Sequence, residues 1–258
     1  MTADRDLDLT PSPGAAPPGQ RVRSQIVLEA RSTLRNPEQL LLTLGIPLVL
    51  LVTLTLLPVL DLGGGSRVDV VTPGILALAV MSTAFTGQAI GTGFERRYGA
   101  LKFLGSTPLT RRQLLLAKTG AVVVIEILQS ALICVVAVAL GWHPQGSLPA
   151  VVLLLLVGTA AFSAPGLALA GVARAEATLA IANGVYLLLL LGGGVVIPTE
   201  RLPSAWAAIA SFLPSGALAD ALRQVLVVGA PLPVSSVLVL VAWAVVGSVV
   251  AARTFKWE

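Results

Sequence analysis

Apolar residues occur in six blocks, each of roughly twenty residues, the length that an α-helix needs to cross the ~30 Å hydrocarbon core of a bilayer. Hydrophobic residues make up 55% of the 258-residue chain and charged residues 12%, with a mean hydropathy of +0.89. A soluble domain has only ~45–50% apolar residues. We therefore predict an all-α integral membrane protein with six transmembrane helices.

We expect one transmembrane domain over residues 21–258, preceded by a disordered cytoplasmic tail, rich in Pro and Gly, over residues 1–20. This tail lacks the basic start and the short apolar core of a signal peptide. An even number of spans places both termini on the same side. The spans are expected at about 38–60, 72–94, 113–140, 148–173, 177–198 and 232–252.

Basic residues determine the expected orientation, because short loops keep Lys and Arg in the cytoplasm. With the N-terminus inside, only Arg67, Arg201 and Arg223 of the 17 basic residues lie outside. The net charge of +4 therefore follows from membrane topology and gives no support to nucleic-acid binding. Frequent Ala, Val, Leu and Arg with few Lys indicate a bacterial gene, so we expect a multi-pass protein of a bacterial plasma membrane.

Chemistry within the chain is not expected. One cysteine, Cys134, and one histidine, His143, supply too few ligands for a metal site and no triad. No lysine directly follows a glycine, so a phosphate-binding P-loop is missing. An intramembrane enzyme would need paired acids or a base at one depth, and the sequence offers a single acid in the spans, Glu126. We expect no catalytic residues and no metal.

Two amphipathic segments border the spans on the expected cytoplasmic side. Apolar residues recur every four positions from Arg21 to Arg35, which predicts a helix lying on the membrane surface. The alternative is a solvated basic lead-in to the first span. Its basic residues are Arg21, Arg23, Arg31 and Arg35.

The second segment, Phe94 to Leu104, predicts a short helix ended by Gly105, with Tyr98, Leu101 and Leu104 on one side. Thr110 and Gln113 then form a capping box at the start of the third span. Such a helix suits the groove of a partner protein. The alternative is a basic loop that only follows the topology rule.

Polar residues inside the spans are candidates for a transport pathway or a permease interface: Gln88, Glu126, Gln129, Asn183 and Tyr186. Glu126 lies near mid-bilayer, where an ionised carboxylate costs at least ~2.5 kcal/mol. It therefore either faces a pathway or has a structural hydrogen bond, to Gln129 or across an interface. The spacing from Gly87 to Gly91 favours close helix packing over substrate contact.

The loop after the fifth span contains two further short apolar helices, joined at Pro214. They are expected in the outer interface or re-entering the bilayer. The preceding glycine run, Gly192 to Gly194, is expected to loosen the fifth span.

Several segments resemble permease subunits of the type-2 class of ABC exporters, which includes daunorubicin-resistance and polysaccharide-export permeases. The resemblance covers almost everything after residue 20. This chain departs from the family at one point. Many relatives carry an acidic residue just before the glycine of the Gly99 to Leu104 segment, whereas this chain has Arg97-Tyr98 before Gly99, and its nearest acid is Glu95. The segments are Arg35-Asn36-Pro37 with Pro47, Gly99-Ala100-Leu101-Lys102-Phe103-Leu104 with Thr107-Pro108-Leu109, Leu213-Pro214 with Asp220-Ala221-Leu222-Arg223, and Phe255-Lys256-Trp257.

The resemblance implies a permease that pairs with a second permease, either a copy of itself or a related chain, and with two cytoplasmic ATPase subunits. ATP and Mg would be bound by the ATPase, and this chain would carry no cofactor. The Arg21 to Arg35 helix would contact the ATPase, and the Thr199 to Leu226 pair would form the outer end of the pathway. The implied coupling residues are Glu95, Tyr98, Gly99, Leu101, Lys102, Phe103, Leu104 and Pro108.

We therefore expect an ATP-driven exporter subunit that moves a small hydrophobic or amphipathic cargo, such as a drug, an antibiotic or a lipid-like molecule. The alternative is an ATP-independent channel, scramblase or assembly scaffold in the lipid bilayer. That alternative leaves the Phe94 to Gln113 segment unexplained.

Overall fold

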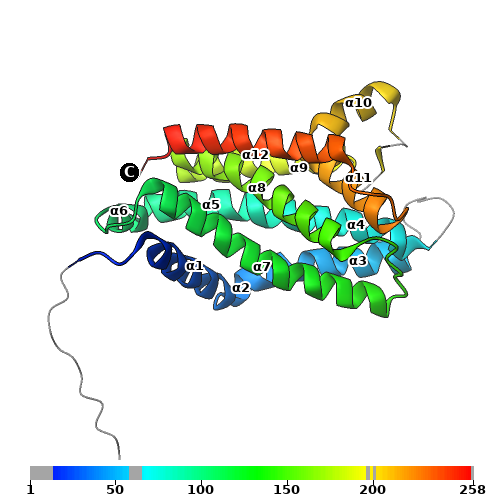
Figure 1. Cartoon of the computed structure of the whole chain (residues 1–258), viewed down its shortest axis with the longest axis horizontal. Coiled ribbons are helices and arrows are strands. Elements are labelled where there is room, and N and C mark those ends of the chain that lie inside the picture. The colour runs from blue at the N-terminus through cyan, green and yellow to red at the C-terminus, as the bar shows by residue number, and fades with distance from the viewer. Residues whose placement is uncertain (1–13, 58–65, 196–197, 200–201, 257–258) are drawn as a thin grey trace, which may run out of the picture.

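The computed structural model describes residues 14–57, 66–195, 198–199 and 202–256, and every regular element among them is helical (Figure 1). Two elements, η1 and η2, are π-helical segments that interrupt the first and second spans. The elements are α1 (Pro18–Leu34), α2 (Pro37–Leu40), η1 (Leu41–Gly45), α3 (Ile46–Leu56), α4 (Arg67–Val80), η2 (Met81–Gly87), α5 (Gln88–Arg97), α6 (Ala100–Gly105), α7 (Arg111–Ala139), α8 (Leu148–Val172), α9 (Ala175–Gly192), α10 (Ser204–Phe212), α11 (Pro214–Leu226) and α12 (Val234–Thr254).

The six predicted spans are confirmed as helices long and apolar enough to cross a membrane. The first span joins α2, η1 and α3, and the second joins α4, η2 and α5. The other four spans are α7, α8, α9 and α12. The predicted capping box of Thr110 and Gln113 is present, and the Asn36 side chain caps α2 by accepting from the Gln39 amide at 3.2 Å.

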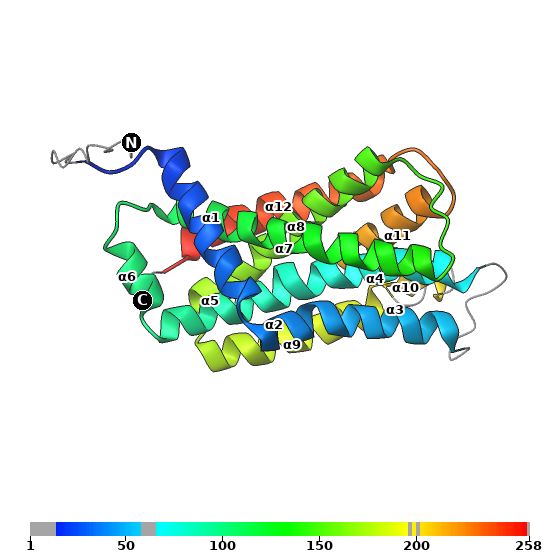
Figure 2. The same cartoon turned by 90° about the horizontal axis from the view of Figure 1, so that it is seen from below.

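The second span is the centre of the bundle. In its most apolar stretch 78% of the residues are buried, compared with 11% in the first and the sixth spans. Figure 2 shows α2 and α3 running along one side of α4 and α5. On the other side of the bundle α12 packs along α8, and α1 packs on α7. The peripheral spans thus leave large apolar surfaces for lipid or for another membrane protein.

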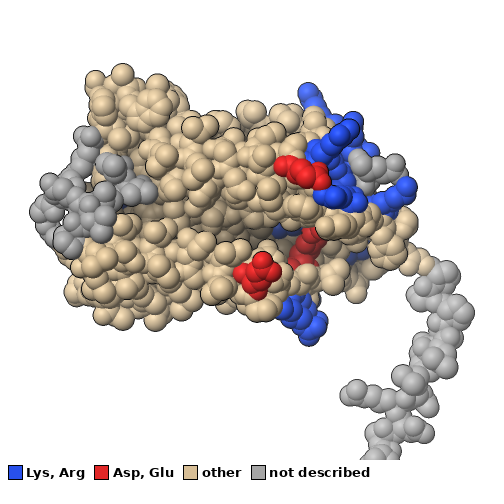
Figure 3. All heavy atoms as spheres, turned by 180° about the vertical axis from the view of Figure 1, so that it is seen from behind, with Lys and Arg blue, Asp and Glu red and all other residues tan. Residues whose placement is uncertain are grey.

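Both described ends of the chain lie at the same end of the bundle, beside α6 (Figure 1). We call it the α6 end, and the opposite one the α11 end. Figure 3 shows one face of the molecule. Lys and Arg side chains gather at the α6 end of this face, and the rest of the face is almost free of charged side chains. This distribution agrees with the charge bias from which the orientation was predicted.

Two of the three basic residues expected outside bind helix ends instead of standing in solvent. Arg67 donates to the carbonyl oxygens of Leu54 and Leu57 at the end of α3, at distances of 2.9–3.2 Å. Arg223 donates to those of Gly194 and Val195 after α9, at 2.7 and 2.6 Å. Carbonyls at helix ends lack intrahelical donors, so these arginines have a structural reason to depart from the charge rule.

The fifth span ends at Gly192, six residues earlier than expected. A side chain at Gly193 would overlap the Ser215 hydroxyl of α11, so this glycine allows a close approach. The Trp206 indole donates to the carbonyl of Gly192 at 3.0 Å. The glycine run therefore ends the helix and seats α10 and α11 against it.

The two predicted outer helices are present as α10 and α11, which meet at Pro214 with a bend of 96°. Helix α11 packs against α4, α8 and α12, whereas α10 is largely exposed. At the other end, α1 begins at Pro18, so residues 18–20, expected in the tail, are helical. Residues 1–13, the end of the first predicted span at 58–60, Arg201 and Trp257 lie outside the described residues.

Candidate functional site

The features that could carry function gather at the α6 end and along the second span. They are the exposed face of α6, a buried cluster around Lys118, and a polar chamber that opens into a groove.

The second span and α6 are separate helices, so the continuous helix predicted from Phe94 to Leu104 is wrong. Tyr98 caps the end of α5, and Gly99 adopts φ +78°, a left-handed conformation that separates α5 from α6. Glycine tolerates this conformation at no steric cost, and the new helix starts at once at Ala100. The predicted Gly105 cap is the last residue of α6, and Ser106 follows as the cap.

Helix α6 has one side packed on the chain and one side free. Leu101 is fully buried in a small apolar cluster with Leu109, Leu114 and Phe255. Phe103 is 73% exposed and Tyr98 is 76% exposed. Leu104 is partly buried against the same cluster, and Lys102, Gly105 and Pro108 are exposed. Leu101 thus holds α6 in place, and the exposed aromatic rings are the surface that a partner could contact.

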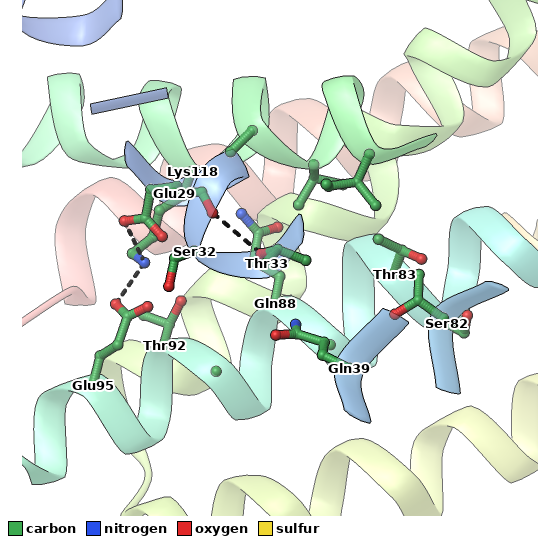
Figure 4. Close-up of a pocket in the computed structure, with 16 residues that line it drawn as sticks. Glu29, Ser32, Thr33, Gln39, Ser82, Thr83, Gln88, Thr92, Glu95 and Lys118 are labelled. Carbon is green, nitrogen blue, oxygen red and sulfur yellow. Dashed lines mark hydrogen bonds and ion pairs between the residues drawn. The ribbon is translucent and has the colours of Figure 1, made fainter. Parts of the chain in front are cut away.

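Lys118 lies at the centre of a buried ionic cluster that joins three helices. Its ammonium is 3.0 Å from Glu29 Oε1 of α1 and 2.6 Å from Glu95 Oε2 of α5 (Figure 4). The lysine side chain is 4% exposed, and those of Glu29 and Glu95 are 18% and 34% exposed. Gln25 adds a hydrogen bond of 2.9 Å to Glu29. Glu95 therefore faces the interior of the chain, not the expected partner surface.

Further bonds join the same helices to their neighbours. Arg21 of α1 donates to the carbonyl of Pro108, in the link between α6 and α7. Arg96 and Arg97 of α5 bind the carbonyl of Ala173 and the carboxylate of Glu176, at the turn between α8 and α9. The other arginines predicted on the first helix, Arg23, Arg31 and Arg35, are exposed.

A polar chamber of about 160 Å³ lies between α1, η1, η2, α5 and α7. Figure 4 shows Gln88 extending into it from α5, on the same face as Thr92 and Glu95. Gln88 is 7% exposed, and neither its amide nitrogen nor its amide oxygen has a hydrogen-bond partner among the described residues. Buried polar groups are normally paired, so this amide needs a partner that the described part of the chain does not supply.

The chamber opens into a groove of about 950 Å³ between the first, second and fifth spans. Gln39, Thr43, Ser82, Gly87 and Gly91 line both spaces. A side chain at Gly91 would meet open space. The prediction that Gly87 and Gly91 allow close helix packing is therefore wrong for contacts within the chain. Asn183 and Tyr186 of α9 also line the groove, whereas Gln88 lines the chamber.

Gln129 has a structural role that follows from Pro47. A proline has no N–H to donate to the carbonyl four residues before it, which here is that of Thr43. The Gln129 amide nitrogen donates to this Thr43 oxygen at 2.6 Å, and its amide oxygen accepts from the Thr83 hydroxyl at 3.1 Å. Gln129 therefore joins the first three spans behind the groove.

Glu126 faces away from the groove. It is 4% exposed and accepts a hydrogen bond from the Thr159 hydroxyl of α8, so the predicted bond to Gln129 is wrong. It contributes to neither the chamber nor the groove, and its second oxygen is buried with no partner among the residues described. Of the two alternatives for Glu126, the geometry within this chain favours the structural one.

A family model described as ABC-2 type transporter matches residues 23–227, which include most of α1, the groove, α6 and α11. The chain belongs to this family. A comparison with curated proteins finds no match.

This ABC-2 chain is therefore a transporter permease, the membrane component that associates with an ABC ATPase. Permeases of this kind generally carry no ATPase site of their own. Within the described part of the permease, no group of three His, Cys, Asp or Glu could hold a metal ion.

Sequence reasoning missed Lys118 as the centre of the buried cluster and counted it only as a basic loop residue. A usable signal was present: Lys118 lies six residues beyond Arg112, on a helix that has already become apolar. A lysine at that depth needs a carboxylate close by. The packing of α1 and α5 against α7 determines which carboxylates bind the lysine, and the sequence does not reveal this packing.

Proposed function

We propose that this permease exports a hydrophobic or amphipathic molecule from a bacterial cell, powered by ATP hydrolysis in a separate ATPase subunit. The α6 end faces the cytoplasm, and both termini lie there. Two ATPase subunits bind two permeases, and ATP and Mg are held by the ATPases.

One observation carries this proposal: α6 stands at the end of the bundle between the second and third spans, with Leu101 fixed inward and Phe103 exposed. An exposed aromatic ring on a short, rigidly seated helix is suited to a groove on a partner. Exposed arginines on α1 and the basic loop around α6 surround it. We assign this surface to the ATPase contact.

Force applied to α6 reaches the groove through α5 and α7, to which α6 is directly connected. Lys118 joins both of these helices to α1, and Arg21 joins α1 to the link after α6. The ATPase-facing elements therefore move as one unit. When the ATPases close, this unit tilts the second and third spans and changes the width of the groove.

The groove is the proposed cargo route, completed on its open side by the second permease. It combines apolar residues of the first and second spans with the polar residues Asn183 and Tyr186, and Gln88 lines the adjoining chamber. The sparsely buried first and fifth spans border it and supply apolar surface for a permease pair. The α10 and α11 pair closes the outer end.

The test is purification of the tagged permease in mild detergent after co-expression with the genes beside it. The proposal predicts co-purification of an ATPase with a phosphate-binding P-loop, in a one-to-one ratio, and ATP hydrolysis by the complex. Recovery of an oligomer of the permease alone would contradict the proposal and support the channel, scramblase or scaffold alternative.

A further inference from the structure

We propose that the groove and chamber select a cationic amphiphile, whose apolar part lies in the groove and whose ammonium head group enters the chamber. This inference rests on the proposed export function and specifies the chemistry of the cargo. Neither the match to the family nor the hydrophobicity of the spans specifies the charge of the cargo.

The charges that line the two spaces are predominantly negative. Glu29 and Glu95 line the chamber, Glu38 lines the groove, and among the residues that the structure describes Lys118 is the only basic one lining either space. Glu29 and Glu95 each bond Lys118 through one of their two oxygens. In the chamber two carboxylates surround one ammonium, and the exposed Glu38 adds a third carboxylate at the groove, so acidic groups outnumber basic ones although the surrounding end of the protein is basic (Figure 3). A positively charged ligand is therefore complementary to the interior, where low dielectric strengthens the attraction.

Gln88 provides a second, independent reason for a ligand. Its amide is more than nine-tenths buried, lies in the chamber wall and has no partner among the described residues, so a bound group would satisfy it. The amide oxygen accepts hydrogen bonds, and a protonated primary amine donates them. A charge-assisted hydrogen bond of this kind is about twice as strong as a neutral one.

The sizes of the two spaces indicate a two-part ligand. The chamber, at about 160 Å³, is smaller than the ~300–1,000 Å³ pockets that hold drug-sized molecules, whereas the groove, at about 950 Å³, is in that range. Leu42, Ile46, Ile90 and Phe94 give the groove an apolar wall. A head group in the chamber and an apolar body in the groove use both spaces at once.

The experiment measures equilibrium binding of a radiolabelled primary alkylamine to the full-length permease in nanodiscs, with empty nanodiscs subtracted. The competitors are an unlabelled alkylamine, an alkanol and an alkanoate with the same chain, together with methylammonium, which has the head group only. The alkylamine should compete at a concentration about tenfold lower than the alkanol, the ratio expected from one charge-assisted hydrogen bond. Methylammonium should compete weakly.

Two substitutions at one position make the test independent of misfolding. Gln88→Leu removes the amide and should reduce the preference for the amine over the alkanol. Gln88→Glu adds a carboxylate and should increase that preference, a gain that a damaged protein would not show. Gln224→Leu and Gln224→Glu, on the exposed side of α11, are the matched controls and should leave the preference unchanged.

The outcomes separate the two proposals, because this binding assay needs no ATPase. Equal competition by amine, alkanol and alkanoate overturns the charge selection and leaves the export function standing. Competition by methylammonium as strong as by the alkylamine overturns the amphiphile, since the site would then take a free cation. A failure to co-purify an ATPase overturns the export function, whatever the binding assay shows.

Discussion

Leu101 and Phe103 lie two residues apart on α6 and have opposite surroundings: Leu101 is fully buried, and Phe103 is 73% exposed. The resemblance to type-2 exporter permeases implies one set of coupling residues that contains both. Their separation means that substitutions at the two positions test different properties of the protein.

Phe103→Asp should abolish co-purification of the ATPase while leaving the permease folded, because exposed positions change stability by only about ±0.5 kcal/mol. Leu101→Ala should instead destabilise the permease by about 2–5 kcal/mol, the usual cost of emptying a core leucine site. Pull-down and thermal unfolding of each variant in detergent measure the two effects. An ATPase that binds Phe103→Asp as well as the parent protein would contradict the assigned contact.

Lys118→Met should lower the stability of the permease, because it leaves two partly buried carboxylates without their cation. Since Glu95 is about a third exposed, we expect the lower end of the ~3–5 kcal/mol cost of breaking a buried ion pair. Adding Glu29→Gln and Glu95→Gln to Lys118→Met should restore most of the loss, since removal of a whole cluster is often neutral. Thermal unfolding checks both, and equal melting temperatures for Lys118→Met and the parent would argue against the cluster.

Gln129→Leu should destabilise the bundle by about 1–3 kcal/mol, because the Thr43 carbonyl loses its donor. Pro47→Ala supplies a backbone N–H to that same carbonyl, so the double variant should lose less stability than the sum of the single variants. The measurement is a double-mutant cycle on thermal unfolding. Strict additivity would show that Pro47 and Gln129 act independently.

Gly74→Ala should destabilise the contact between α4 and the segment after α9. An added Cβ would overlap the carbonyl oxygen of Val195 and lie 3.3 Å from Arg223 Nη2. Gly91→Ala is the matched control in the same span, because its Cβ meets open space. The better helix propensity of alanine should raise the free energy of unfolding by about 0.5–1 kcal/mol. Both changes are measured as shifts of the melting temperature, with opposite signs expected.

The spans could be predicted because their signal is local: a block of about twenty apolar residues identifies itself without knowledge of its neighbours. The break at Gly99 was missed because the apolar spacing from Phe94 to Leu104 fits one continuous helix. Only the left-handed conformation of Gly99 separates α6 from α5. The sequence alone does not show whether a glycine within an amphipathic pattern continues the helix or interrupts it.

Partners of the buried polar residues could not be predicted for a different reason. Glu126 and Gln129 lie three residues apart on α7, which suggested a bond between them. In the structure they bind Thr159 of α8 and Thr43 of η1. Which neighbouring helix a residue faces depends on the rotation of every span in the bundle, and no local pattern encodes it.

The Lys118 cluster also limits how far the chain can be shortened from its N-terminal side without loss of a buried contact. Helix α1 supplies one of the two carboxylates, and its Ile26 lies so close to Gly120 that a side chain at that glycine would meet it at 2.7 Å. A chain that began at the first span would lack Glu29, and the surface of α7 around Gly120 would be exposed. A truncated form that is to be produced in a native state must therefore begin before Pro18.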